Sequence, residues 1–133
     1  LAKASQKSLI QSMHDCSEGG IALAAAEMAF AGALGMELSA GEIPFVGKSR
    51  FVNQKPRRTN EVLLFSQSNS RFVAEVRRKD RIKFENLLQG VSFGLIGCVT
   101  KDKNFRIFGL EGKPCIEEHV AALKDAWQKT MRY

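Results

Sequence analysis

The stretch MHDCSEGGIALAAAEMAFAG, residues 13–32, decides how this chain folds around its first half. Its second part, residues 21–31, consists of Ala, Ile, Leu, Met and Phe with one Glu, and Ala, Leu and Met are strong helix formers. Gly32 then supplies a stop signal of the kind that ends helices. The pattern predicts a helix over residues 21–31.

This helix has an unusual polarity, because Glu27 is the only polar residue in the run. A helix that is apolar nearly all round is buried on more than one side. A single small domain rarely covers both sides of one helix. We therefore expect one face to pack on a sheet of this chain and the other on a further domain or subunit.

The residues before the helix predict an anion site. Asp15, Ser17, Gly19 and Gly20 stand at its start, where free backbone N–H groups and the positive end of the helix dipole favour a phosphate. Asp15 offers a hard oxygen ligand of the kind that Mg²⁺ accepts beside substrate phosphates. Two simpler interpretations stay open: Asp15 as an N-cap or Asx turn, and Ser17 as a helix cap.

Histidine titrates near neutral pH, so His14 is either a general base or a structural residue beside the turn. The second histidine, His119, is expected at the surface of the last helix. The three cysteines, Cys16, Cys98 and Cys115, form no CxxC pair. Their odd number and spacing disfavour a disulfide framework or a zinc site and favour reduced thiols in the cytoplasm, where we expect all three to be packing residues.

The composition indicates one soluble domain over residues 1–133, with 44% hydrophobic and 26% charged residues. We expect no membrane association, since no apolar run approaches the roughly 18 residues of a transmembrane helix and no signal peptide opens the chain. The net charge of +6 comes largely from residues 48–58 and 77–83, which we interpret as solvated surface without a nucleic-acid partner. The first residue is Leu, which suggests a fragment of a longer protein.

Hydrophobic periodicity and turn residues predict the remaining elements. They are a helix over 1–13, a strand over 35–40 continued at 43–46, a surface loop over 47–60, strands over 61–67 and 71–78 forming a hairpin around the turn 68–70, a helix over 80–88 between Asp80 and Gly90, a hairpin-like strand pair over 93–100 and 105–110, and a helix over 116–132. This order predicts an α+β layered domain, partly ferredoxin-like, with a mostly antiparallel mixed sheet covered by helices.

Three segments resemble one family. The motif His14-Asp15-Cys16-Ser17-Glu18-Gly19-Gly20, the helix segment AEMAFAG at 26–32 with Gly35, and LFSQSNSRF at 64–72 are similar to the C-terminal domain of phosphoribosylformylglycinamidine synthase. The resemblance extends to the strand at 94–100 and to the last helix. It places the chain in a wider superfamily of aminoimidazole ribonucleotide synthetase-related C-terminal domains.

The resemblance implies a reaction. Enzymes of this family use ATP to activate the formamide oxygen of formylglycinamide ribonucleotide, and ammonia from a glutaminase partner displaces the phosphate to give the amidine of de novo purine biosynthesis. Such a synthetase contains two copies of an N-terminal and a C-terminal half, and this chain resembles the second C-terminal half. Its expected partners are the other domains of the same synthetase chain, a glutaminase subunit and a small accessory subunit. Alone, the fragment is expected to be inactive.

By the same resemblance, Asp15 matches the position that reaches Mg²⁺ beside ATP, or beside ADP at a structural site, and Ser17 matches a nucleotide contact. Gly19 and Gly20 leave the backbone open there, whereas no residue of this chain is expected to be catalytic. Gln67 stands where many relatives have Glu. The alternatives are a domain of a selenophosphate synthetase or thiamine-monophosphate kinase type of enzyme, and a non-catalytic interaction domain.

Overall fold

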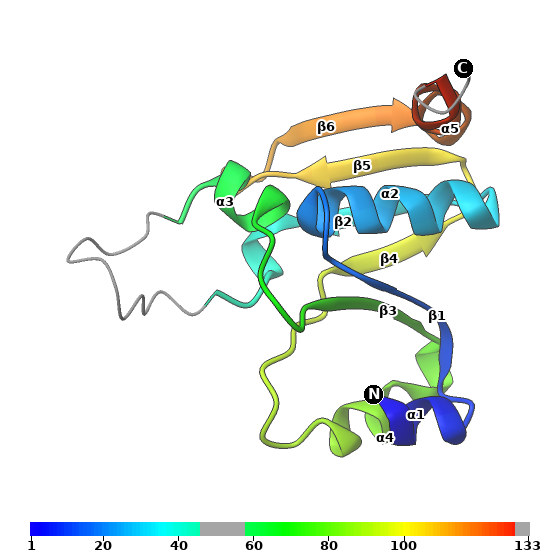
Figure 1. Cartoon of the computed structure of the whole chain (residues 1–133), viewed down its shortest axis with the longest axis vertical. Coiled ribbons are helices and arrows are strands. Elements are labelled where there is room, and N and C mark those ends of the chain that lie inside the picture. Colours follow the sequence, from blue (N-terminus) through cyan, green and yellow to red (C-terminus); the bar gives the residue numbers. More distant parts are fainter. Residues whose placement is uncertain (46–57, 130–133) are drawn as a thin grey trace.

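Two sheets organise the computed structural model, which describes residues 1–45 and 58–129 (Figure 1). Strands β1 (Ile10–Asp15) and β3 (Phe72–Val76) form an antiparallel ribbon. The larger sheet has the order β4-β2-β5-β6, with β4 (Gly97–Thr100), β2 (Gly35–Ser39), β5 (Asn104–Phe108) and β6 (Pro114–His119). Among the strands of residues 1–45 and 58–129, only the pair β2–β5 is parallel. The prediction of an α+β domain with a mostly antiparallel mixed sheet is confirmed.

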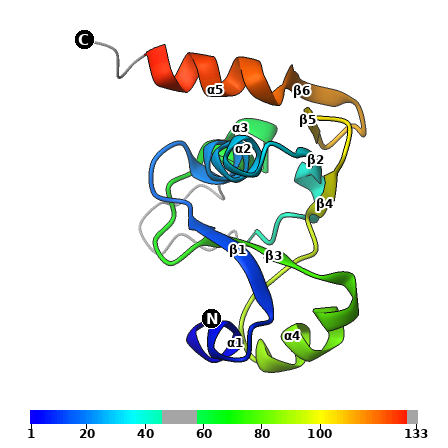
Figure 2. The same cartoon turned by 90° about the vertical axis from the view of Figure 1, so that its right-hand side faces the viewer.

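Five helices complete the described chain: α1 (Ala2–Gln6), α2 (Gly20–Gly32), α3 (Asn60–Phe65), α4 (Arg81–Leu87) and α5 (Val120–Lys129). Helix α2 lies along one face of the larger sheet, while α1 and α4 lie at the far end of the β1–β3 ribbon (Figures 1 and 2). Within the described residues, no helix has the length and apolarity needed to cross a membrane.

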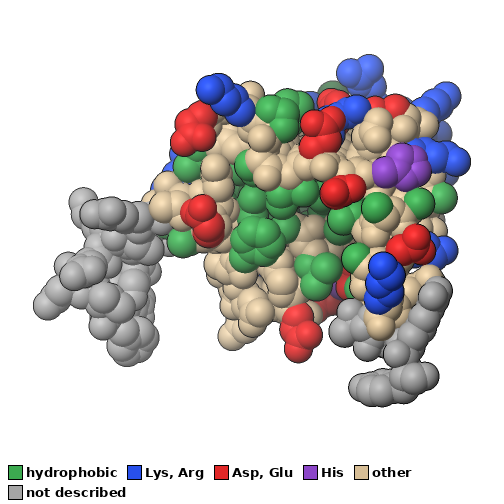
Figure 3. Space-filling model, turned by 90° about the horizontal axis from the view of Figure 1, so that it is seen from above, with side chains coloured by type: hydrophobic (Ala, Val, Ile, Leu, Met, Phe, Trp, Pro, Cys, Tyr) green, Lys and Arg blue, Asp and Glu red, His purple; other side chains and the backbone are tan. Residues whose placement is uncertain are grey.

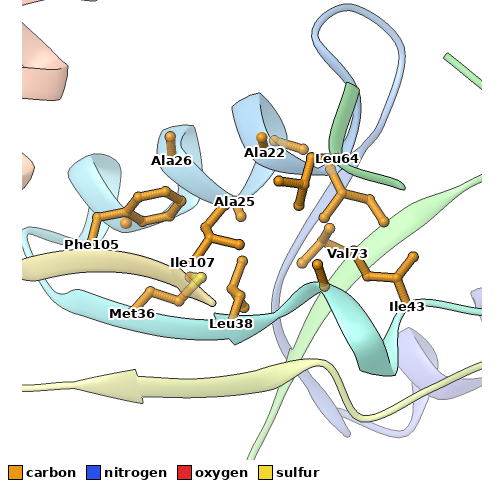
Figure 4. Close-up of a cluster of buried hydrophobic side chains, with 14 of the residues drawn as sticks. Ala22, Ala25, Ala26, Met36, Leu38, Ile43, Leu64, Val73, Phe105 and Ile107 are labelled. Atoms are coloured by element: carbon orange, nitrogen blue, oxygen red, sulfur yellow. The ribbon is translucent and has the colours of Figure 1, made fainter. Parts of the chain in front are cut away.

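Helix α2 is the centre of the core, as the alanine-rich stretch predicts. Ala25, which is fully buried, lies over Leu38 and Ile107 of the sheet (Figure 4). Other sides of α2 meet α3, α5 and the β1–β3 ribbon. The expectation that a separate domain covers the second face is therefore wrong for most of the helix, because small alanine side chains let the chain's own elements approach closely. Leu23 remains 37% exposed.

The end of α2 differs from the prediction by one residue. Gly32 is still helical, and the left-handed residue that ends the helix is Ala33, with φ 50° and ψ 37°. Its N–H donates to the carbonyls of Ala29 and Phe30. A glycine was the expected residue because left-handed backbone costs an alanine free energy.

The helix predicted over residues 1–13 is wrong after Gln6. Ser8 has a positive φ of 54°, and Ile10–Asp15 form strand β1, paired with β3. The residues Leu9, Ile10 and Met13 fit a helical spacing as well as a strand. The long-range partner β3 decided between the two, which no local pattern could reveal.

The strand predicted over residues 61–67 is helix α3 instead, so the predicted hairpin with 71–78 is also wrong. Thr59 caps the helix, since its Oγ1 accepts the Val62 N–H at 3.4 Å. Leu63 and Leu64 are buried in the core. Strand β3 itself is confirmed, but its partner is β1.

Strands β4 and β5 do not form a hairpin, because β2 lies between them. The connecting loop crosses the start of β2 at Gly35, where a Cβ atom would lie 2.4 Å from Thr100 Oγ1 and 2.6 Å from Asp102 Oδ1. Asp102 shapes the loop by accepting hydrogen bonds from Thr100 Oγ1 at 2.6 Å and from Arg106 at 2.7 Å. A glycine at position 35 therefore permits the crossing.

Several boundaries differ from the predictions. Residues 116–119 belong to β6, and the last helix begins at Val120; residues 130–132 of the predicted helix lie outside the described residues. His119 ends β6, where its Nδ1 accepts the Ala121 N–H at 3.2 Å and so caps α5. The strand at 35–40 is confirmed as β2 and the helix at 80–88 as α4.

The continuation strand at 43–46 is absent at residues 43–45, and residue 46 lies outside the described residues, as does the predicted loop up to residue 57.

On the face seen in Figure 3, Lys and Arg side chains are interspersed with Asp and Glu around a hydrophobic centre. This distribution is typical of solvated surface charge.

Candidate functional site

The predicted motif and the segment at 64–72 meet across a shallow hollow of about 470 Å³. The loop from β1 to α2 forms one wall, and the connection from α3 to β3 forms the other. The lining residues are Asp15, Cys16, Ser17, Glu18, Gln67, Ser68, Asn69, Ser70, Arg71 and Phe72. The fold thus brings together two motifs that are far apart in the sequence.

Strand pairing fixes the two walls against each other. Asp15 pairs with Phe72, and the Cys16 N–H donates to the Arg71 carbonyl at 2.9 Å, which continues the ladder by one step. Arg71 in turn donates from Nη1 to Ser66 Oγ at 3.0 Å. Arg71 therefore contributes to the wall of the hollow, and its guanidinium is held by Ser66.

The start of α2 is shaped by two glycines with positive φ, Gly19 at 69° and Gly20 at 63°. A Cβ atom at Gly20 would lie 2.5 Å from the Leu64 carbonyl oxygen, so this glycine permits α2 to approach the backbone of α3. Gly19 is the N-cap, and no side chain among the described residues caps the helix there. The cap interpretations of Asp15 and Ser17 are therefore wrong, and the first N–H groups of this 13-residue helix lack a side-chain partner.

Asp15 ends β1 with a side chain that is 57% exposed, and Ser17 and Glu18 are exposed beside it. No group of three or more His, Cys, Asp or Glu in the described part of the chain could hold a metal ion. Mg²⁺ binds through one or two carboxylates together with substrate phosphates and waters. The exposed carboxylate of Asp15 is one donor of the kind that such an ion accepts.

Cys16 is buried beneath the loop, and this burial is the main reason that the pKa of its thiol is raised. The nearby charge of Arg71 lowers this pKa and that of Asp15 raises it, each by less than burial does. A protonated, buried thiol is a poor nucleophile. The packing role predicted for Cys16 is confirmed. Cys98 and Cys115 are exposed, so that prediction is wrong for them.

His14 does not line this hollow. It faces a second, more apolar hollow of about 400 Å³ between β1 and the end of α2. Its Nε2 lies 2.6 Å from Glu27 Oε2, and its Nδ1 lies 2.6 Å from the Asp15 carbonyl oxygen. Since both nitrogens are engaged, the structural interpretation of His14 fits and the general-base interpretation does not.

Sequence reasoning missed the role of Glu27. Its carboxylate contacts His14 and also accepts the Trp127 Nε1–H at 3.0 Å. The available signal was its isolation in an apolar helix, because a buried or half-buried charge in such a run needs partners. The identity of those partners depended on where β1 and α5 lie.

This chain is similar in sequence to a known family and to several known proteins. Residues 1–109 match the family described as AIR synthase related protein, C-terminal domain. The chain is 32% identical over 124 residues to phosphoribosylformylglycinamidine synthase subunit PurL of Synechocystis sp., which covers 90% of this chain and 14% of that protein. It is 29% identical over 133 residues to the same subunit of Alkaliphilus metalliredigens, covering 96% of this chain and 15% of that protein.

Solved structures show the same fold. T. maritima PurL complexed with ADP has a TM-score of 0.74 at 16% identity, and PurLQS from Thermotoga maritima has 0.72 at 18%; each match covers 91% of this chain and 20% of the other. T. maritima PurL complexed with ATP gives a TM-score of 0.70 at 19% identity, with the same coverage. The chain thus spans a small part of the length of the curated relatives that it matches.

Proposed function

Because the chain belongs to the family of AIR synthase related protein C-terminal domains, we propose that it is one domain of an ATP-dependent phosphoribosylformylglycinamidine synthase. That enzyme is a C–N ligase of purine biosynthesis, which converts formylglycinamide ribonucleotide, ATP and glutamine-derived ammonia to the amidine. The role of this domain is to complete a Mg-nucleotide site and to dock with the other domains of its own chain. A glutaminase subunit and a small accessory subunit are the further partners, in the cytoplasm.

The observation that carries the proposal is the hollow that joins the 15–18 loop to the 67–72 segment. It combines an uncapped helix start at Gly19 and Gly20, an exposed hydroxyl at Ser17, a guanidinium at Arg71 and an exposed carboxylate at Asp15. The first three suit phosphate oxygens, and the last suits a cation beside them. Relatives of the same fold have been solved with ATP, ADP and AMPPCP.

In this proposal the chain's residues bind and orient, and none transfers a group. Ser17 and the first N–H groups of α2 hold phosphate oxygens, while Arg71 neutralises charge at the rim. Asp15 is one ligand of Mg²⁺, which when bound would offset the charge of the phosphates. The remaining ligands and the substrate pocket come from the other domains, so the site is shared.

The test uses the intact synthetase that contains this domain, with Asp15→Asn and the matched control Asp125→Asn on the exposed surface of α5. Loss of one metal ligand is expected to weaken Mg-nucleotide binding about tenfold or more, equivalent to about 1.4 kcal/mol. The bound nucleotide is measured after rapid gel filtration, and turnover is measured alongside. Unchanged nucleotide content and unchanged turnover in Asp15→Asn would overturn the assignment.

A further inference from the structure

Glu27 of α2 contacts both β1, which leads into the site, and α5. Its Oε2 lies 2.6 Å from His14 Nε2 on β1, and its Oε1 accepts the Trp127 Nε1–H of α5 at 3.0 Å. The Trp127 ring also packs on Phe30 of α2, with ring centroids 5.7 Å apart. One half-buried carboxylate on α2 therefore holds both β1 and α5.

His14 extends this connection to Asp15. The imidazole Nδ1 lies 2.6 Å from the Asp15 carbonyl oxygen and 3.6 Å from its Oδ1. The ring thus touches the backbone and the carboxylate of the residue that ends β1. Any movement of the ring away from Glu27 would move these contacts with it.

The β1–β3 ribbon needs such an anchor. A two-stranded ribbon is marginally stable by itself, because its strands have no further neighbours in a sheet. The ladder fixes Asp15 against Phe72. The His14–Glu27 contact adds a tie between β1 and the middle of α2, about two turns along the helix from Gly20.

We propose that His14 and Glu27 are positioning residues for Asp15, which hold its carboxylate at a set distance from the first turn of α2. The inference rests on the proposed function, in which Asp15 and that turn bind Mg²⁺ and phosphate. A displacement of about 1 Å in such a constellation weakens binding substantially. Trp127 supports Glu27 by fixing its rotamer.

Four variants of the intact synthetase test this chain of contacts. His14→Gln keeps a donor near the place of Nε2, facing Glu27, whereas His14→Asn keeps one near the place of Nδ1, facing Asp15. Glu27→Gln keeps the size of the side chain but exchanges one acceptor oxygen for a donor. Trp127→Phe keeps an aromatic ring beside Phe30 but removes the N–H group together with part of the indole.

The readouts are KM for Mg-ATP, kcat and the urea midpoint. We expect Glu27→Gln and His14→Asn to raise KM about five- to tenfold, with kcat changed less than twofold. His14→Gln should have a KM close to that of the parent enzyme, because it keeps the donor that faces Glu27. Trp127→Phe should raise KM about twofold. The control is Glu85→Gln, which breaks the exposed Arg81–Glu85 pair on α4 and should leave KM unchanged.

The outcomes separate this inference from the proposed function. If Asp15→Asn raises KM while the His14 and Glu27 variants do not, the positioning role is refuted and the proposed function stands. A lower urea midpoint with an unchanged KM likewise refutes it, because the residues would then be merely structural. If Asp15→Asn has no effect, both fall. Should Glu27→Gln fail to fold, the comparison of His14→Gln with His14→Asn decides.

Discussion

Replacing Gly20 by alanine is the sharpest test of how α2 is seated. Gly20 has a φ of 63°, and the added Cβ would lie 2.5 Å from the Leu64 carbonyl oxygen and 2.8 Å from the Phe65 carbonyl carbon. Both atoms belong to backbone, so neither can turn aside as a flexible side chain would. The start of α2 and helix α3 must therefore move apart.

The magnitude follows from two costs. Left-handed backbone costs a non-glycine residue about 1–2 kcal/mol. Overpacking of a close contact costs a further 1–3 kcal/mol, roughly. Their sum, about 2–5 kcal/mol, is a large part of the 5–15 kcal/mol, approximately, by which a domain is stable.

Gly32→Ala provides the control on the same helix. Gly32 lies in the last turn with no atom within 4 Å of an added Cβ, and alanine there should stabilise the chain by about 0.5–1 kcal/mol. Urea unfolding followed by circular dichroism gives both free energies. A loss below about 1 kcal/mol for Gly20→Ala, or equal losses for the two variants, would refute the proposed contact between α2 and α3.

Three further predictions concern other residues. Ala33→Gly should stabilise the chain by about 1 kcal/mol in the same urea assay, because Ala33 ends α2 with φ 50°; a destabilised variant would contradict this. The pKa of Asp102 lies well below its usual range, mainly because its carboxylate accepts a hydrogen bond from the Thr100 hydroxyl and another from Arg106. The ionised carboxylate therefore stabilises the folded state above about pH 4, and this stabilisation is lost as the pH falls further. The thermal midpoint of Asp102→Asn should accordingly lie below that of the parent chain at pH 5 and converge with it toward pH 2, and a constant gap would count against the assignment. In the native chain, Ellman's reagent should modify Cys98 and Cys115 promptly and Cys16 only after unfolding; rapid reaction of all three thiols would show that the core around Cys16 is open.

The local signals in the sequence were sufficient to predict α2, and they also led to the hypothesis of an anion site at its start. Residues 21–31 have a composition that favours a helix in any context, and two glycines with an acid and a hydroxyl before a helix are a local arrangement. Strand β3 and helix α4 were also predicted from local signals, although Val73 is the buried residue of β3 and Phe72 is 45% exposed. The structure placed each of these within a few residues of its predicted bounds.

The failed predictions of secondary structure and strand pairing at residues 10–15, at 61–67 and in the two hairpins share one cause, which is pairing over long distances in the chain. Residues 10–15 and 61–67 contain apolar residues that suit a helix or a strand, and the choice followed from the partner of β3. The two predicted hairpins were wrong because neighbours in the sequence are not neighbours in the sheets. Gly35, which lets the loop after β4 cross the start of β2, shows how one missing side chain permits such an order.

The candidate site likewise combines residues that local sequence signals indicate with contacts that only the packing of distant segments creates. The sequence by itself proposed Asp15, Ser17, Gly19 and Gly20 as a candidate phosphate and metal site, because they stand together at the start of a strong helix pattern. Only the tertiary structure decided that Arg71 closes the same hollow and that His14 is held by Glu27 and Trp127. The physical reason is that composition and spacing act within a few residues, whereas the distances between side chains depend on how sheets and helices pack.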